Sequence, residues 1–257
     1  MNAVFPEPIE RFRTDYAAYR AGEGRAHRGD ELCRLPYLKS GPLAREWAVR
    51  ARTFEAFVRR IVSPMGQDRS LDVLDLGAGN GWLSWRLAAR GHRCIAIDVR
   101  DDTIDGLGAA EDLRRLVAFD CVVASFEALP LAGRSADLAV FNASLHYATD
   151  LAATMAETIR CLQPGGVIAV LDSPFYRNAA DGGAMVREKR ALAHAGRLLA
   201  LDCIEYLTRE RLERASGLAW RCHRVRYPLW YELRPLAARL HGRRHPSRFD
   251  LWTAAVR

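Results

Sequence analysis

The sequence predicts an α/β fold in which helices cover both faces of a mainly parallel sheet. Three observations indicate this class. From residue 71 onward, short apolar runs alternate with segments of helical periodicity. Runs such as 136–142 are nearly all apolar, as expected for strands buried on both faces. A glycine-rich turn joins the first strand to the next helix. Strands separated by helices imply right-handed βαβ crossovers.

The first 62 residues are predicted to be a helical extension that belongs to the same domain as the core at 63–257. Helices are expected over 9–20 and 42–62, with a glycine-containing break at 21–24 between them. The second helix should end at Ser63-Pro64-Met65-Gly66, because proline and glycine both stop helices.

The core is expected to contain seven strands and five helices. The strands are predicted at 71–76, 93–99, 116–124, 136–142, 167–171, 219–227 and 249–256, with a turn at 163–166. The helices are predicted at 82–90, 103–113, 151–162, 181–199 and 209–215. Asp150 and Thr208 precede two of them and can act as N-caps.

Length and composition allow one large domain or two small ones, and the order of motifs, with strands expected up to the C-terminus, favours one domain. The chain has 257 residues, of which 49% are hydrophobic and 27% charged, so it can bury roughly 70–75% of its unfolded surface. No apolar run reaches the length of a membrane span, and no secretory signal is visible, so a cytoplasmic protein is expected. The six cysteines lack the spacing of metal ligands, which favours reduced thiols and no metal site.

The positive charge is concentrated in the last fifth of the chain. The net charge is +7, and residues 201–257 hold twelve arginines against six acidic residues. A solvated arginine-rich face explains this excess, and a surface for RNA or an acidic substrate is the alternative.

The segment 73–82 has the features of a nucleotide-binding loop, because a strand enters it and a helix leaves it. Gly77, Gly79 and Gly81 are spaced G-x-G-x-G, and Trp82 occupies the place of the third glycine of a dinucleotide fingerprint. Asp98 ends the second strand, where a carboxylate can accept both hydroxyls of an adenosine ribose.

These residues, together with later motifs, resemble the class I S-adenosylmethionine-dependent methyltransferases of the small-molecule, type 11 kind. The resemblance rests on 75–81, Asp98, 127–130 and 162–166, and it spans roughly residues 50–175. It implies S-adenosylmethionine as cofactor and a Rossmann-like, doubly wound sheet of seven strands. The implied order is 3-2-1-4-5-7-6, with the last strand antiparallel and a helical N-terminal lid.

The resemblance also implies positions for the cofactor. The glycine loop would pass under its methionine part, Asp98 would hold the ribose, and Val99 would support the adenine. Ser125 and Phe126 stand where relatives usually have an acid, so they would contact the adenine edge. The expected cofactor residues are Arg52, Asp75, Gly77, Ala78, Gly79, Asp98, Val99, Ser125, Phe126 and Asn142. Arg50 is the alternative to Arg52 for the methionine carboxylate.

The chemistry of methyl transfer requires the acceptor and the methyl group to be held in line, and a base only when the acceptor carries a proton. His146 follows the fourth strand and is the candidate base, with a substrate-binding role as the alternative. Tyr16, Tyr19, Arg20 and Tyr37 suggest a lid over the site, or ordinary amphipathic helices. Asp172 and Tyr176 follow the fifth strand, and either is a candidate to orient the substrate.

The leading functional hypothesis is therefore methylation of a small molecule. Asn142 is not followed by Pro-Pro-Tyr, the arrangement of related enzymes that methylate DNA bases or glutamine. Two alternatives remain open: an RNA methyltransferase that uses the arginine-rich C-terminal face, and a non-catalytic scaffold with the same fold. The sequence does not indicate an oligomeric state.

Overall fold

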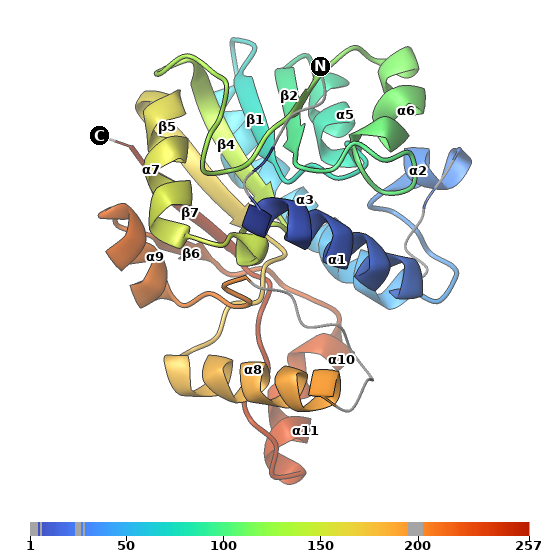
Figure 1. Ribbon diagram of the computed structural model, residues 1–257, viewed down its shortest axis with the longest axis vertical. Coiled ribbons are helices and arrows are strands. Elements are labelled where there is room, and N and C mark those ends of the chain that lie inside the picture. Colours follow the sequence, from blue (N-terminus) through green and yellow to red (C-terminus); the bar gives the residue numbers. More distant parts are fainter. Residues whose placement is uncertain (1–4, 6, 24–26, 28, 195–202, 257) are drawn as a thin grey trace.

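A computed structural model of the chain shows a seven-stranded sheet with helices on both faces (Figure 1). All residues are described except 1–4, 6, 24–26, 28, 195–202 and 257. The strands are β1 (Asp72–Leu76), β2 (Arg93–Asp98), β3 (Asp120–Val123), β4 (Ala136–Asn142), β5 (Leu162–Leu171), β6 (Arg221–His223) and β7 (Leu251–Ala255). Their order across the sheet is β3-β2-β1-β4-β5-β7-β6, which confirms the expected fold.

The strand directions also agree with the expected architecture. β1 pairs in parallel with β2 and β4, and β5 continues the parallel part beside β4. β7 runs antiparallel to both β5 and β6. The carboxyl ends of the five parallel strands therefore meet at one edge of the sheet, which is where open α/β sheets bind ligands.

Eleven α-helices surround the sheet in the described part of the chain. They are α1 (Glu7–Glu23), α2 (Asp30–Arg34), α3 (Ala44–Phe57), α4 (Ser63–Met65), α5 (Trp82–Ala88), α6 (Glu111–Leu116), α7 (Leu151–Cys161), α8 (Ala179–His194), α9 (Arg209–Ser216), α10 (Leu229–Glu232) and α11 (Arg234–Leu240). Short 3₁₀ turns cover Leu107–Ala110 and Leu145–Tyr147, and a π-helical turn covers Val58–Val62.

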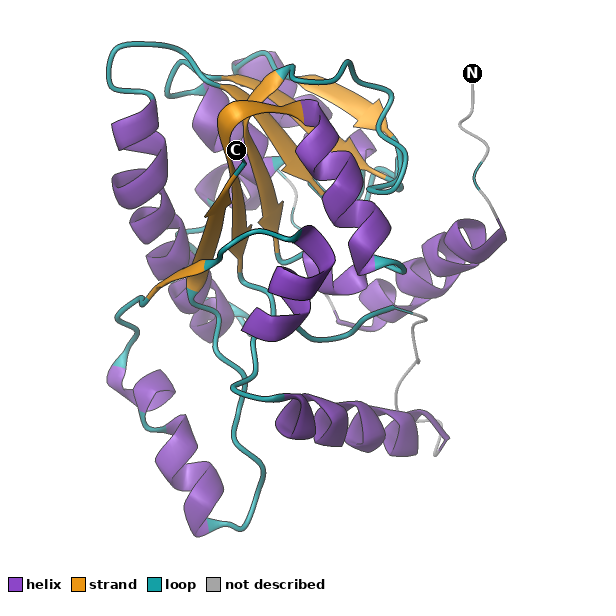
Figure 2. Cartoon of the chain, turned by 90° about the vertical axis from the view of Figure 1, so that its left-hand side faces the viewer, coloured by secondary structure: helices purple, strands orange, loops and turns teal. Residues whose placement is uncertain are grey.

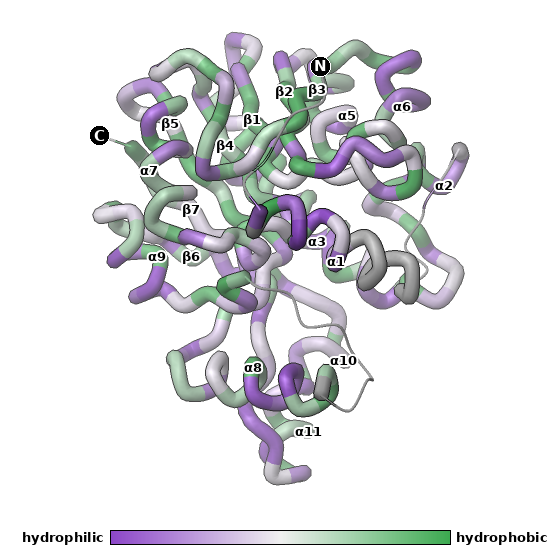
Figure 3. Tube along the Cα trace, in the orientation of Figure 1, coloured by the Kyte–Doolittle hydropathy of each residue, from purple (hydrophilic) through white to green (hydrophobic). Residues whose placement is uncertain are grey.

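The two faces of the sheet build separate hydrophobic clusters, because alternate residues of a strand point to opposite sides. On one side, Val73 of β1 packs in a cluster with α3, α5 and α6. On the other side, Leu74 and Leu76 pack in a cluster with α7 and α9. Figure 2 shows the layers from the side, and Figure 3 shows the hydrophobic stretch around β2 and β3.

The two predicted helix caps are confirmed. The Asp150 carboxylate accepts hydrogen bonds from the amides of Ala152 and Ala153 at the start of α7. The Thr208 hydroxyl accepts one from the Arg211 amide at the start of α9. Each cap satisfies amides that would otherwise lack a partner in the first turn.

Several predicted boundaries were wrong. Residues 163–166 do not form a separate turn but lie within β5. Here the pairing shifts register: Ala136 and Leu138, two residues apart in β4, pair with Leu162 and Val167, five residues apart in β5. The strand expected from residue 116 begins only at Asp120, because α6 extends to Leu116. The helix expected at 103–113 is a 3₁₀ turn followed by α6, and the strand expected at 219–227 is only three residues long. Part of the helix expected at 181–199 lies outside the described residues.

Other features of the helices differ from expectation or were not expected. The helix expected at 42–62 begins at Ala44. From α3 the helical structure continues through the π-helical turn at Val58–Val62 into α4, which contains Pro64. This helical segment ends at Met65 with Gly66 as its C-cap, which confirms the predicted end at residues 63–66. α10 and α11 were not predicted from the sequence. Among the described residues, no helix is both long and apolar enough to cross a bilayer.

Candidate functional site

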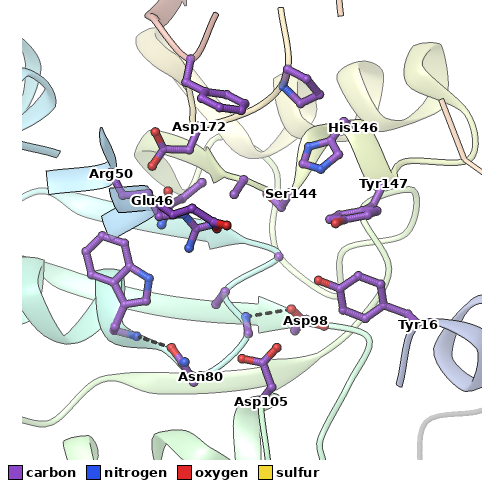
Figure 4. Close-up of a pocket in the computed structure, with 18 of the residues that line it drawn as sticks. Tyr16, Glu46, Arg50, Asn80, Asp98, Asp105, Ser144, His146, Tyr147 and Asp172 are labelled. Atoms are coloured by element: carbon purple, nitrogen blue, oxygen red, sulfur yellow. Dashed lines mark hydrogen bonds between the residues drawn. The ribbon is translucent and has the colours of Figure 1, made fainter. Parts of the chain in front are cut away.

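A cavity of about 600 Å³ lies at the carboxyl ends of the parallel strands, under α1 and α3. Figure 4 shows its wall: Asp172 and Arg50 lie on one side, Tyr16 and Tyr147 lie on the other, and the His146 ring points between them. The loops after β1, β2, β3, β4 and β5 each contribute residues. We call the part beside residues 77–79 the glycine-loop end and the part beside Asp172 the Asp172 end.

The glycine loop closes the cavity with bare backbone. Gly77 and Gly79 both have positive φ angles, +78° and +54°, which an L side chain rarely adopts. A Cβ on Gly77 would lie 2.3 Å from the Cβ of Ser144, so only glycine fits there. The amides of Gly77 and Ala78 both donate to the carbonyl of Ile97, which ties the loop to β2. A ligand can therefore lie directly against this loop.

Asp75 lies beneath this loop, and the cavity wall does not include it. Its side chain is fully buried, and one carboxylate oxygen accepts from the amide and hydroxyl of Ser84, at 3.2 and 2.8 Å. Burial raises the pKa of Asp75 to about 7, although the Ser84 hydrogen bonds act in the opposite direction. Asp75 therefore has a structural role, because its hydrogen bonds with Ser84 join β1 to α5.

Asp98 ends β2 and lines the cavity beside the loop. Its Oδ2 accepts a hydrogen bond from the Gly79 amide, and its Oδ1 accepts one from the Arg100 amide. Burial raises the pKa of Asp98, and the two amide bonds partly offset that effect. Val99 follows it in the cavity wall.

Two further loops complete the glycine-loop end. After β3, Ser125 and Phe126 line the cavity, and the Phe126 ring packs edge-on against Phe141 at 5.5 Å. At the end of β4, Asn142 lines the cavity, and its buried Oδ1 has no hydrogen-bond partner within the described structure. A buried polar atom without a partner at a cavity wall indicates that a ligand supplies one.

The Asp172 end contains two titratable side chains with opposite pKa shifts. Burial lowers the pKa of His146 to about 3, and the positive charges of Lys189 and Arg50 act in the same direction. Burial raises the pKa of Asp172 to about 6, partly offset by Arg50 and Thr53. His146 is therefore neutral at pH 7, while Asp172 gains or loses its proton near pH 6, just below pH 7.

Asp172 itself is unusual in its backbone and its hydrogen bonding. It follows β5 with a φ angle of +51°, and its side chain is buried. Its Oδ1 has no hydrogen-bond partner among the residues described. A positive φ angle costs free energy for a residue other than glycine, and such strain concentrates at functional sites.

Aromatic side chains from α1 cover the cavity. The Tyr16 ring packs edge-on against Tyr147 at 4.9 Å and is stacked on Phe12 at 5.3 Å. Arg13 of the same helix pairs with Asp101, just beyond β2, at 3.1 Å. α1 is therefore held across the top of the cavity from both sides.

Comparison with known proteins agrees with this geometry. Residues 74–170 match the family model described as a methyltransferase domain. Over 111 residues, the chain is 33% identical to the malonyl-[acyl-carrier protein] O-methyltransferase of Yersinia pestis. That match covers 42% of this chain and 39% of the relative, so the chain spans about two fifths of the relative's length.

Two solved structures share the fold. Geranyl diphosphate C-methyltransferase from Streptomyces coelicolor, solved with S-adenosylhomocysteine, gives a TM-score of 0.62 at 16% identity. It covers 99% of this chain and 100% of that one. The 1,6-didemethyltoxoflavin-N1-methyltransferase of Burkholderia thailandensis gives a TM-score of 0.57 at 18% identity, covering 100% and 93%.

Residues 74–170 are therefore similar to the methyltransferase domain of class I S-adenosylmethionine-dependent methyltransferases. The matched segment begins within β1 and contains β2, β3 and β4 and most of β5, together with the loops after the first four strands. It therefore supplies the whole glycine-loop end of the cavity, while α1, α3 and the residues after 170 lie outside it. The cofactor of this family is S-adenosylmethionine.

Of the methyltransferase residues expected from the sequence, ten side chains or loop positions line the cavity. They are Tyr16, Gly77, Ala78, Gly79, Asp98, Val99, Ser125, Phe126, Asn142 and His146. Arg52 lies on the opposite side of α3 and pairs with Glu55, whereas Arg50, the alternative, lines the cavity. The two arginines differ by two residues, and a helix turns about 200° over that distance.

Other expected residues of the methyltransferase lie elsewhere. Tyr37 is 39% exposed and packs near Arg86, outside the cavity wall. Tyr176 bonds to Arg244 and is also outside the wall. The side chains of Tyr19 and Arg20 lie outside the described residues.

Sequence reasoning did not single out several residues of the wall. They are Glu46, Trp47, Asp105, Tyr147, Trp230, Tyr231, Arg234 and Phe249. Glu46, Trp47 and Arg50 share one face of α3, and this spacing was the available signal. No comparable signal marked the residues from α10 and α11, because those helices were not expected.

Proposed function

We propose that this protein transfers the methyl group of S-adenosylmethionine to a small molecule that carries a hydroxyl or N–H group. The observation that supports this proposal is the division of one cavity into two chemically different ends. The glycine-loop end offers backbone and Asp98, and the Asp172 end offers titratable and aromatic side chains. Such a cavity can hold a cofactor and an acceptor side by side.

The residues at the glycine-loop end fit the cofactor. Gly77 leaves the space in which a methionine chain lies, and Asp98 accepts hydrogen bonds from the ribose hydroxyls. Ser125 and Phe126 contact the adenine, and the unpartnered Oδ1 of Asn142 accepts from the cofactor's amino group. When bound, S-adenosylmethionine supplies an electrophilic methyl group on a sulfonium.

Arg50 is the cation proposed for the methionine carboxylate. It lies in the cavity wall, and its guanidinium is 4.9 Å from the centre of the Trp47 ring. The ring restricts the side chain and favours a defined position over the cavity. A carboxylate bound to Arg50 would also reduce the positive charge beside His146 and Asp172.

Asp172 is the proposed group that receives a proton from the acceptor. Its ionised carboxylate accepts the hydroxyl or N–H hydrogen, and the acceptor's electron pair is directed at the methyl carbon. The acceptor gains the methyl group, the carboxylate gains the proton, and the proton then passes to water. The sequence favoured His146 for this role, but a pKa of about 3 makes the imidazole a weak base. As a neutral ring, His146 can instead hydrogen-bond the acceptor.

The acceptor is proposed to be aromatic or otherwise conjugated. Trp230, Tyr231 and Phe249 line the Asp172 end, together with Pro174. Flat apolar walls favour planar molecules, and a few polar groups then fix their orientation. An acceptor that reacts through a carboxylate would lie against the Asp172 charge, which disfavours it. A malonyl carboxylate, the acceptor type named for the Yersinia relative, is therefore disfavoured at this end of the cavity.

Calorimetry with S-adenosylhomocysteine tests the function. We expect micromolar binding by the wild-type protein, and a protein that binds neither this compound nor S-adenosylmethionine would refute the proposal. A screen with methyl-labelled S-adenosylmethionine then tests the acceptor class, using panels of phenols, aromatic amines and carboxylic acids. Label in phenols or amines supports the Asp172 role, while label confined to carboxylic acids contradicts it.

A further inference from the structure

Four leucines form an exposed stripe along α10 and α11. Leu229, Leu233, Leu236 and Leu240 follow at intervals of four, three and four residues, and they are 72%, 47%, 55% and 76% exposed. Leu233 joins the two helices in a helical conformation, so the segment continues as one helical face. These intervals place all four leucines on one side. We call them the leucine stripe.

The opposite side of this segment is anchored in the protein. Tyr231 is only 1% exposed, and its hydroxyl accepts a hydrogen bond from the Phe249 amide. The Arg234 guanidinium lies 3.8 Å from the centre of the Tyr231 ring. Because these contacts fix the buried side, the leucine stripe is held outward. Large apolar side chains that gather on a surface usually mark an interaction site.

The surroundings of the leucine stripe are positively charged. Residues 229–248 contain five arginines and one acidic residue, Glu232; Glu232 pairs with Arg248, and Glu188 of α8 pairs with Arg244. Arg239 and Arg243 are exposed at the end of α11, next to Leu240. An apolar stripe bordered by arginines complements a surface that is both apolar and anionic.

The shape of the molecule selects among such surfaces. Figures 1 and 2 both show α11 at the end of the long axis, projecting away from the sheet. A projecting helix can lie on a flat surface without any cleft in its partner. A second copy of the chain would bring two arginine-rich segments together, and their mutual repulsion disfavours that contact.

We propose that the leucine stripe docks this protein onto membranes that contain anionic phospholipids. The leucines enter the interface between headgroups and acyl chains, and Arg239 and Arg243 bind headgroup phosphates. Trp230, 41% exposed beside the stripe, occupies the interfacial position that tryptophan prefers. Trp230 and Arg234 also line the cavity, so docking brings its Asp172 end close to the lipid surface. Apolar acceptors dissolved in the membrane would then be delivered to the site.

Vesicle sedimentation tests this proposal with the full-length protein. One set of vesicles is phosphatidylcholine alone, and the other is phosphatidylcholine and phosphatidylglycerol in equal parts. We expect binding to the anionic vesicles to be at least tenfold stronger, and to weaken with salt. Leu236→Ser/Leu240→Ser and Arg239→Ser/Arg243→Ser should each reduce it at least about tenfold. Leu116→Ser is the matched control, because Leu116 is 61% exposed on α6, far from α11 (Figure 1).

Three results would overturn the proposal. The first is the absence of binding to anionic vesicles, and the second is an equal loss of binding in the Leu116→Ser control. The third is binding of tRNA, or a dimer in ultracentrifugation, that the leucine variants abolish while vesicle binding is unchanged. Circular dichroism and S-adenosylhomocysteine binding should be the same in all variants, which separates docking from folding. Because vesicle binding needs no acceptor, this result is independent of the proposed function.

Discussion

Oδ2 of Asp98 accepts a hydrogen bond from the amide of Gly79 at 2.8 Å. This contact joins the end of β2 to the glycine loop that follows β1, so the acid and the bare backbone share one cavity wall. Because the two strands pair in parallel with Leu76 opposite Ile97, their carboxyl ends finish side by side.

Asp98→Ala should weaken S-adenosylhomocysteine binding by roughly 100-fold or more. Two hydrogen bonds to a charged acceptor would be lost, and each such bond contributes about 1.5 kcal/mol or more. Titration calorimetry provides the measurement. Asp120→Ala is the control, because Asp120 is exposed at the start of β3, at the end away from the cavity. This variant should bind S-adenosylhomocysteine as tightly as the wild type. An unchanged affinity in Asp98→Ala would remove the ribose role.

Arg50→Ala and Arg52→Ala should have different effects on cofactor binding. Arg50 lines the cavity, whereas Arg52 is on the exposed side of α3 and pairs with Glu55 at 3.4 Å. Loss of an ion pair inside the cavity should reduce affinity about tenfold or more, and loss of the exposed pair should change little. Equal effects of the two substitutions on S-adenosylhomocysteine affinity would contradict the assignment.

Asp172→Asn should remove the acidic limb of the pH–rate profile. Only the ionised carboxylate accepts a proton, so wild-type kcat/KM should fall as the pH drops below about 6. The variant should lose about 10²- to 10⁴-fold in rate and retain S-adenosylhomocysteine binding. His146→Gln should keep the limb near pH 6. If His146→Gln loses the limb and Asp172→Asn keeps it, the histidine is the base.

Asp75→Asn should become more stable relative to the wild type as the pH rises. The pKa of Asp75 is about 7 in the folded protein and 3.8 in the unfolded chain, so the folded state retains the proton over that interval. The wild type therefore loses stability from pH 4 to pH 7, by up to about 4 kcal/mol, and the variant lacks this loss. Urea unfolding of both proteins at several pH values measures the difference. A difference that does not change with pH would refute it.

Gly77→Ala should destabilise the protein more than Gly165→Ala. Both glycines have similar φ angles, +78° and +82°, so both substitutions carry the left-handed backbone cost of about 1–2 kcal/mol. A Cβ on Gly77 also meets Ser144 at 2.3 Å, whereas nothing lies within 4 Å of one on Gly165. The free energy of unfolding should therefore separate the two variants, and only Gly77→Ala should impair cofactor binding. Equal losses would show that the close contact with Ser144 is relieved without cost.

The loop positions that form the glycine-loop end could be predicted from the sequence because their signals are local. A strand, a spaced set of glycines and Asp98 at the end of the next strand all lie within residues 71–98. The helix caps at Asp150 and Thr208 are local in the same sense, since each bonds amides two or three residues away.

The Asp172 end could not be predicted in the same way. Its wall joins Arg50 of α3, His146 after β4 and Tyr231 of α10, which are far apart in the chain. The choice between Arg50 and Arg52 depends on the rotation of α3 against the sheet. The pKa values of His146 and Asp172 depend on burial by segments that are distant in sequence.

The sequence alone therefore determined the α/β class, the glycine loop and the place of Asp98, because hydrophobic periodicity and turn chemistry act between near neighbours. Through the family resemblance, it also determined the strand order. Only the tertiary structure decided which side chains meet over the cavity, which buried groups change their pKa, and which leucines stay outside. Those properties depend on packing and desolvation, and both depend on residues that the fold brings together from distant parts of the chain.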